Sequence, residues 1–189
     1  MRLFIAINFN DATASSLIAL RDALQSRAAY GRFSALENLH LTLVFLGESD
    51  MKQTAAAKTA MDAIKFEPFT ITIDRIGRFR RSGGDVWWAG VRENKALSNL
   101  HGDLTDKLIA VGFELEKRRY SPHITLGREI VTNEPPREIE PFTGAVSAFE
   151  LMKSAHIRGK LTYTTIHKRT IQTDRALLFS EGKRVGKAT

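Results

Sequence analysis

A short pattern that occurs twice constrains the fold of this chain more than any other feature. Residues 40–43 read His-Leu-Thr-Leu, and residues 123–126, 83 positions later, read His-Ile-Thr-Leu. Each copy lies in a segment rich in strand-forming residues and is preceded by a segment with helical spacing. Two copies of one β–α–β unit that face each other would account for this weak internal repeat.

Each motif predicts a histidine and a threonine on one face of a strand. Residues i and i+2 of a strand point the same way, so His40 shares a face with Thr42, and His123 shares a face with Thr125. The apolar residues between them would anchor each strand in a core. If the two halves face each other, two imidazoles and two hydroxyls converge on one cleft.

Such a cleft has the groups that phosphodiester cleavage needs without a metal. A lone histidine on a strand is more often structural, but one imidazole of a pair can act as an acid while the other acts as a base. The hydroxyls can donate hydrogen bonds to an anion. Arg128, shortly after the second motif, can add positive charge for a phosphate.

Other site chemistries find little support in the sequence. Two histidines can ligate zinc, but stable sites use three or four protein ligands, and neither an HxH nor an HExxH motif nor an acidic cluster adjoins them. The GxSxG, P-loop and GxGxxG patterns are absent. The chain has no cysteine, which excludes disulfides, thiolate metal sites and a cysteine nucleophile. We therefore expect neither a metal nor a cofactor.

The composition predicts one soluble domain with an anionic partner. Its 189 residues, 43% of them hydrophobic, suit a single domain spanning 1–189. No stretch resembles a signal peptide or a membrane span, so we expect a cytoplasmic monomer without membrane contact. The net charge of +7 favours nucleic acid or a phosphorylated ligand. Basic clusters occur at 78–81, 117–119 and 183–187, where a solvated surface is the alternative to RNA binding.

The expected elements follow the order βαβαββαββββ, which favours an α+β fold with antiparallel pairing over a doubly wound parallel sheet. Helices are expected from Asp11, in a region ended by Gly31, at 53–64 and at 95–111. Residues 133–141 hold three of the five prolines and are expected to be a connector. Strands are expected at 3–8, 40–46, 69–76, 86–91, 121–126, 145–153, 162–170 and 176–180, with a hairpin around the turn at 82–85.

The two motifs and their flanks resemble the 2H phosphoesterases. The similarity is greatest to the bacterial and archaeal RNA 2′,3′-cyclic phosphodiesterase branch, once described as 2′-5′ RNA ligases. It spans residues 2 to about 169 and rests on RLFIAINF, ENLHLTLVFLGE, VWWAGV, SPHITLGR and FELMKSAHIRGKLTY. The resemblance implies a bilobal fold of two pseudo-symmetric, interleaved lobes with antiparallel sheets, one motif in each lobe and a central active-site cleft.

The resemblance also implies a reaction and roles for five residues. The reaction is hydrolysis of a 2′,3′-cyclic phosphate, on RNA ends or small cyclic nucleotides, to a 2′-phosphomonoester without metal. His40 would be the proton donor to the leaving O3′, and His123 the proton acceptor from water. Thr42, Thr125 and Arg128 would bind the phosphate. Binding of such ends without turnover, or physiological 2′-5′ RNA ligation, are the alternatives.

Other residues carry weaker expectations. Strict alternation places Phe45 opposite His40, which favours a core position over stacking on a base. Trp87 and Trp88 are adjacent on a strand and are expected on opposite faces. We expect a structural His101, surface positions for His156 and His167, and either cleft support or ordinary packing for Tyr120, Ser154 and Tyr163.

Overall fold

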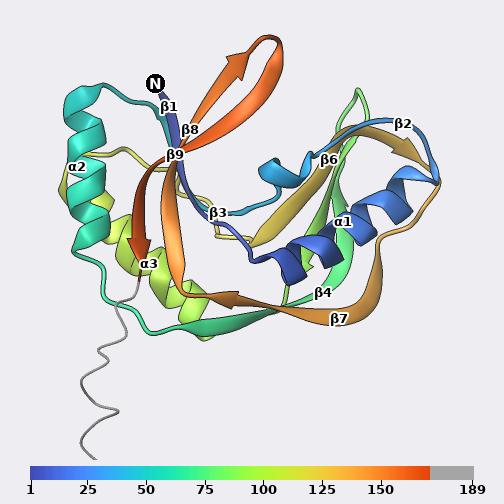
Figure 1. The fold of residues 1–189 in the computed structure, drawn as a ribbon, viewed down its shortest axis with the longest axis horizontal. Helices are drawn as coiled ribbons and strands as arrows, with labels where there is room; N and C mark the ends of the chain where they lie inside the picture. The colour runs from blue at the N-terminus through green and yellow to red at the C-terminus, as the bar shows by residue number, and fades with distance from the viewer. Residues whose placement is uncertain (171–189) are drawn as a thin grey trace, which may run out of the picture.

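The computed structural model describes residues 1–170 (Figure 1), so the strand expected at 176–180 and the basic cluster at 183–187 lie outside the described residues. No helix of the described part is long and apolar enough to cross a bilayer. Its elements are β1 (Arg2–Ile7), α1 (Asp11–Gln25), β2 (Ala28–Phe33), the 3-10 turn η1 (Leu36–Asn38), β3 (Leu41–Glu48), α2 (Met51–Asp62), β4 (Phe69–Phe79), β5 (Asp85–Val91), α3 (Lys95–Ala110), β6 (His123–Thr132), β7 (Arg137–Val146), β8 (Ala148–Ile157) and β9 (Lys160–Thr170).

The strands form one sheet in which every described pairing is antiparallel, as expected for the α+β class. Its order is β7-β4-β5-β6-β3-β1-β8-β9, with β2 paired to β6 off this path. The two motif strands, β3 and β6, lie at the centre and share a single residue pair, Leu41 with Ile124. The sheet thus consists of two halves that meet at the two motifs, one of five strands (β7, β4, β5, β6 and β2) and one of four (β3, β1, β8 and β9).

The helices are divided between these halves. Helices α2 and α3 contact each other and pack near β9 and β3, whereas α1 contacts β2, β6 and β7. Figure 1 shows α2 and α3 on the left of the molecule and α1 on the right, with the β8–β9 hairpin and the β4–β5 hairpin projecting toward the same side. Each half therefore has its own helical cover, and the seam between β3 and β6 lies between the two covers.

Strand β1 shows how residues are sorted between the core and the seam. Leu3 and Ile5 alternate into the main hydrophobic core. Phe4 and Ala6 point to the other face, where they pack with Met152 of β8. The strand expected at 3–8 is thus confirmed, and its second face gives this half an apolar patch beside the first motif.

Two segments differ from the expectation. Strand β2 lies where a helix ended by Gly31 was expected, and a Cβ at Gly31 would come within 2.8 Å of Ile130. The second half of the connector expected at 133–141 belongs instead to strand β7 (Arg137–Val146), at the end of the sheet order. Pro141 is tolerated there because an edge strand has a free side on which no backbone donor is needed. Helix α1 begins at Asp11 as expected, and its N-cap is Asn10, whose side chain accepts from the backbone N–H of Thr13.

The two adjacent tryptophans of β5 lie on opposite faces, as expected. Trp87 is fully buried in the core, whereas Trp88 packs against Phe79, with ring centroids 5.4 Å apart. Gly77 of β4 makes room for Trp88, since a Cβ there would lie 2.2 Å from the indole.

We expect Gly77→Ala to lower the free energy of unfolding by about 1–3 kcal/mol, because the indole must leave its position. Urea unfolding followed by circular dichroism measures this change. Gly83→Ala is the matched control, since nothing lies within 4 Å of a Cβ at Gly83. Equal stability of the two variants would show that Trp88 can shift without cost.

Candidate active site

Strand β3 carries a β-bulge directly after its motif threonine. The pairing with β1 skips Leu43, whose neighbours Thr42 and Val44 are paired with successive residues of β1. A bulge reverses the alternation of side chains beyond it, so Phe45 returns to the face of His40. Phe45 is 57% exposed. The expectation of a core position for Phe45 is therefore wrong, because strict alternation stops at the bulge.

Strand β6 has the same feature at the equivalent position. Its pairing with β5 skips Leu126, whose neighbours Thr125 and Gly127 are paired with the two successive tryptophans. The reversal returns Arg128 to the face of His123. In both halves the same face thus presents the motif histidine, the threonine two positions after that histidine, and a third side chain five positions after the histidine. The repeat seen in the sequence extends to this third position, with Phe45 in one half and Arg128 in the other.

The two imidazoles are held in the same way. Nδ1 of His40 lies 2.9 Å from the backbone oxygen of Asn38, and Nδ1 of His123 lies 2.7 Å from that of Ser121. A carbonyl oxygen only accepts, so Nδ1–H donates in both rings and Nε2 is the nitrogen left for other chemistry. In each motif the acceptor lies two residues before the histidine, so the local backbone sets the tautomer and the ring orientation.

Aromatic rings enclose both histidines. His40 packs edge-on against Tyr163 of β9, with centroids 5.1 Å apart, and lies 4.9 Å from the ring of Phe4. His123 packs edge-on against Phe79 at 5.1 Å. These contacts restrict ring rotation and exclude water from one side of each imidazole.

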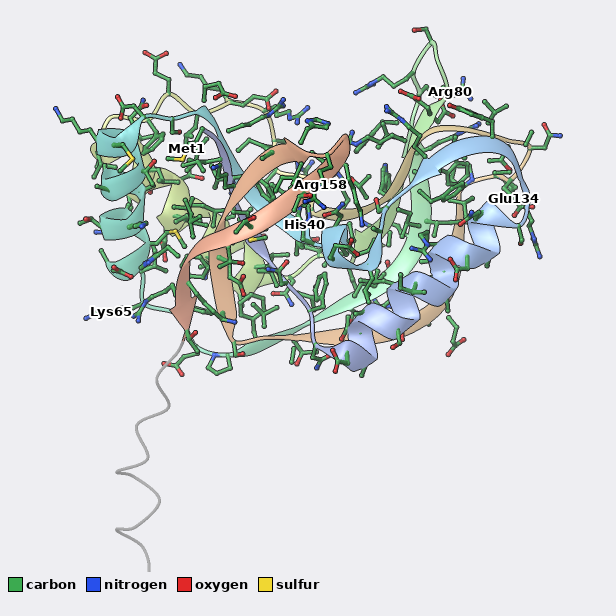
Figure 2. All side chains as sticks on the ribbon, turned by 45° about the horizontal axis from the view of Figure 1, so that its top comes forward. Met1, His40, Lys65, Arg80, Glu134 and Arg158 are labelled. Atoms are coloured by element: carbon green, nitrogen blue, oxygen red, sulfur yellow. The ribbon has the colours of Figure 1, made fainter. Side chains whose placement is uncertain are left out.

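The histidines and Arg128 share one electrostatic environment. Figure 2 labels His40 close to the β8–β9 hairpin, in accord with its contact with β9. Burial lowers the pKa of His40 to about 4; the hydrogen bond to Asn38 opposes this, and the charges of Arg128 and His123 add to it. Burial also lowers the pKa of His123, helped by Arg118 and Arg128. Both shifts favour the neutral imidazole in the ligand-free protein.

The predicted phosphate-binding residues have unused donors. Thr42 and Thr125 are half-buried, and neither hydroxyl is hydrogen-bonded to a side chain or backbone group of residues 1–170. Arg128 is exposed and forms no ion pair with any residue of the described part of the chain. Two hydroxyls and one guanidinium are therefore available to an anion at the seam.

A cavity of about 310 Å³ opens beside the motifs. It includes Thr42 and His123 of the two motifs but neither His40 nor Arg128, so it extends to one side of the histidine pair. Its other walls come from the end of β3, the tip of the β4–β5 hairpin, helix α3 and the loop before β6. The aromatic and basic side chains among these walls are Phe45, Phe79, Arg81, His101, Arg118, Arg119 and Tyr120.

Tyr120 ties the loop before the second motif to the strand of the first. Its hydroxyl donates to the backbone oxygen of Thr42 at 3.1 Å. Its ring stacks on His101 with centroids 3.9 Å apart and an angle of 7° between the planes. Burial raises the pKa of Tyr120, so the hydroxyl stays a donor. Tyr120 therefore supports the cleft, and His101, expected as structural, forms the stack and also lines the cavity.

The remaining weaker candidates lie outside the histidine pair. His156 is exposed, as expected. His167 is half-buried, and its Nε2 lies 2.8 Å from Oδ1 of Asp62, so it pairs β9 with α2 rather than lying free on the surface. Ser154 lies opposite Tyr163 in the β8–β9 ladder.

Within residues 1–170, no three histidine, aspartate or glutamate side chains are grouped so that they could hold a metal ion. The histidine pair thus has no third protein ligand of the kind that zinc sites use.

The sequence did not point to most of the cavity wall. Phe79 and His101 are brought to it from two separate segments by tertiary contacts that no local pattern marks. The basic clusters at 78–81 and 117–119 were one signal, since Arg81, Arg118 and Arg119 line the cavity. A second signal was the common offset of five positions between each histidine and its third side chain, which strict alternation obscures.

Comparison with known proteins finds relatives that match most of this chain. The model of the 2′-5′ RNA ligase superfamily matches residues 9–156. A curated RNA 2′,3′-cyclic phosphodiesterase of Escherichia coli K12 is 34% identical over 171 residues, which cover 88% of this chain and 94% of that protein. Another, from Thermotoga maritima, is 34% identical over 131 residues, which cover 68% of this chain and 70% of that protein.

Solved structures show the same fold. The crystal structure of E. coli LigT complexed with 3′-AMP matches with a TM-score of 0.79 at 32% identity, over 90% of this chain and 97% of that one. The complex of LigT with ATP matches with a TM-score of 0.73 at 31% identity, over 90% and 97%. Nucleotides are thus bound by proteins of this architecture.

Proposed function

This chain belongs to the 2′-5′ RNA ligase superfamily, and we propose that its two histidines hydrolyse an RNA 2′,3′-cyclic phosphate to a 2′-phosphomonoester without a metal. Its curated relatives, at 28–34% identity, are RNA 2′,3′-cyclic phosphodiesterases, so the chain is a hydrolase of this class. The two-histidine chemistry and the roles of individual residues are the content of the proposal.

One observation carries it: two histidines with the same backbone anchor lie on the two central strands, each with a free Nε2. A pair of this kind can hold a proton at one ring and accept one at the other. Nothing in a purely binding role requires both rings to be oriented through Nδ1.

In the proposed reaction, Nε2 of His123 accepts a proton from water as the water oxygen bonds to phosphorus. The bond from phosphorus to O3′ breaks, and protonated Nε2 of His40 donates its proton to O3′. The product keeps the ester to O2′. Thr42, Thr125 and Arg128 donate to the non-bridging oxygens, where negative charge accumulates.

The low pKa of His40 assigns a role to the substrate in this scheme. At neutral pH the free enzyme has little protonated His40, because burial and the charges of Arg128 and His123 disfavour the imidazolium. A bound cyclic phosphate is an anion, so it offsets these charges and raises the pKa of His40. The acid is thus prepared by the substrate that it will protonate.

The proposal is tested by incubating the protein with 2′,3′-cyclic AMP in excess EDTA and resolving the products. We expect 2′-AMP and no 3′-AMP, at a rate that the chelator leaves unchanged. Loss of activity in EDTA contradicts the metal-free mechanism. Tight, salt-sensitive binding without product points to a binding module, and joined product from cyclic-phosphate and 5′-hydroxyl RNA ends points to ligation.

The pH dependence should differ between the free and the loaded enzyme. Activity needs one proton on the pair, so it falls below the lower and above the higher apparent pKa of the pair. Because both pKa values are lowered in the free protein, we expect the kcat/KM optimum below the ordinary histidine pKa of about 6.5. The bound anion should shift the kcat optimum to higher pH. Profiles of both constants at fixed ionic strength test this; a kcat/KM optimum above that of kcat would contradict it.

A further inference from the structure

The seam between the two motif strands contains little backbone pairing. Strand β3 pairs with β1 along its whole length, and β6 pairs with β5 and β2, but β3 and β6 are joined by the pair Leu41 with Ile124. A ladder at one point does not fix the spacing of two strands beyond that point. The distance between the two histidines therefore depends on further contacts across the seam.

Tyr120 makes such a contact. Its hydroxyl donates to the backbone oxygen of Thr42 at 3.1 Å, and Thr42 directly follows the paired Leu41. The residue after Tyr120 is Ser121, whose backbone oxygen lies 2.7 Å from Nδ1 of His123. One hydrogen bond thus connects the first motif to the backbone group that orients the second histidine.

We propose that Tyr120 is a positioning residue, whose hydroxyl sets the spacing between the first motif and His123. This inference rests on the proposed function, because the spacing affects the rate only if both histidines take part in the reaction. Tyr120 acts through the two motifs and does not need to touch the substrate. The bond also fixes the backbone of Thr42, whose hydroxyl is a proposed phosphate donor.

Tyr120 is itself held from the side of the first motif. Its ring stacks on His101 of α3, with centroids 3.9 Å apart and 7° between the planes. Helix α3 covers the half of the sheet that contains β3 (Figure 1) and contacts that strand, whereas residues 111–122 between α3 and β6 are irregular. The stack therefore gives the irregular segment a point of attachment shortly before the second motif.

The hydroxyl of Tyr120 keeps its proton wherever the histidines titrate. Burial raises the pKa of Tyr120, whereas it lowers the pKa of both motif histidines. The hydroxyl is therefore a donor at every pH at which the enzyme is active. Phenylalanine at this position keeps the ring and the stack but has no donor for Thr42, so Tyr120→Phe removes the connection across the seam and little else.

The test measures kcat and KM for 2′,3′-cyclic AMP in the wild-type protein and in Tyr120→Phe. We expect kcat to fall about 10-fold, part of the roughly 10²-fold that a misplacement of about 1 Å can cost, with little change in KM. The groups that bind the phosphate remain, but the two rings no longer meet the reacting atoms together. An unchanged kcat, or a loss confined to KM, overturns the inference.

Thr13→Val is the matched control for stability. The buried hydroxyl of Thr13 donates to the backbone oxygen of Thr143, also at 3.1 Å, and this bond joins α1 to β7 within the half of the second motif. Each variant loses one hydrogen bond from a hydroxyl to a carbonyl, so we expect similar losses of stability in urea unfolding. Thr13→Val should keep the wild-type kcat. An equal loss of kcat in both variants would mean that Tyr120 acts through stability alone, against the inference.

A double variant tests whether Tyr120 acts through the histidine pair. In His40→Ala one ring is already absent, so the addition of Tyr120→Phe should lower kcat little further. A further loss by the same factor as in the wild-type background would show that Tyr120 acts independently of the pair, for example by touching the substrate. The inference would then be wrong.

Crystal structures of the ligand-free wild type and Tyr120→Phe separate this inference from the proposed function. We expect the distance between the two Nε2 atoms to change by about 0.5 Å or more, the tolerance of a catalytic constellation. If the folded histidine variants keep the wild-type kcat, the proposed function fails, and the positioning of the rings is decided by this distance alone. An unchanged distance overturns the inference whatever the rates are.

Discussion

Replacing either His40 or His123 by alanine is expected to lower kcat on 2′,3′-cyclic AMP by at least about 10²–10⁴-fold, the usual contribution of one acid–base group. The His40 variant leaves the backbone oxygen of Asn38 in place, and the His123 variant leaves that of Ser121. Each variant removes the Nε2 that its motif presents to the seam. In the proposed mechanism the two rings act in one concerted proton transfer, so the double variant should lose little more than either single variant. Steady-state rates with purified proteins measure all three.

Two controls keep this result specific. His156→Ala removes an exposed histidine from the β8–β9 hairpin and should retain the wild-type rate. Circular dichroism melts of the His40 variant are needed because its ring packs against Phe4 and Tyr163. A folded His40 or His123 variant with near-wild-type kcat would exclude the two-histidine mechanism. Multiplicative losses in the double variant would indicate that the rings act in separate steps.

Much of the fold could be predicted because its elements have strong periodic patterns. Helix α3 buries Leu97, Leu100, Leu104 and Leu108, which recur at three and four residues. Strand β1 is a short apolar run with β-branched Ile5 and Ile7, and its sequence predicts a strand. The pairing of the two motifs could also be predicted, because one pattern on two strands places like residues on like faces.

The sequence-based predictions were wrong where local patterns and tertiary contacts disagree. Alternation failed at Leu43, where one unpaired residue moved Phe45 from the expected core to the cleft. Strand β2 escaped prediction because Gly31 weakens its pattern and its pairing with β6 supplies the order. The prolines of 133–141 suggested a connector, but the position of β7 at the sheet edge tolerates Pro141.

The candidate site also divides into residues that the sequence predicts and residues that it does not. His40, Thr42, His123 and Thr125 could be found from the sequence because each pair lies within one strand. The cavity could not, because its walls are assembled from β3, the β4–β5 hairpin, α3 and the loop before β6. The cavity is therefore the part of the site that only the three-dimensional structure assembles.

Arg128→Ala is expected to lower kcat by about 10²–10³-fold, the usual effect of removing one donor to a developing anion. Arg128 lies five positions after His123 and returns to the cleft face through the bulge at Leu126. It has no ion-pair partner within residues 1–170, so its charge is available to the phosphate. Arg128→Lys should recover part of the rate, because it keeps the charge but not the two-pronged geometry.

A shift in the pH profile distinguishes this role from a structural one. Burial is the main reason for the low pKa of both histidines, and the charge of Arg128 lowers both further. Removing that charge makes each imidazole easier to protonate, so both limbs of the kcat/KM profile should move to higher pH in Arg128→Ala and stay in place in Arg128→Lys. Arg137→Ala, on the outer strand β7, changes the net charge equally and should move neither limb. A lower rate with an unmoved profile would mean that Arg128 acts through the fold, because a guanidinium beside both rings cannot be removed without changing their protonation.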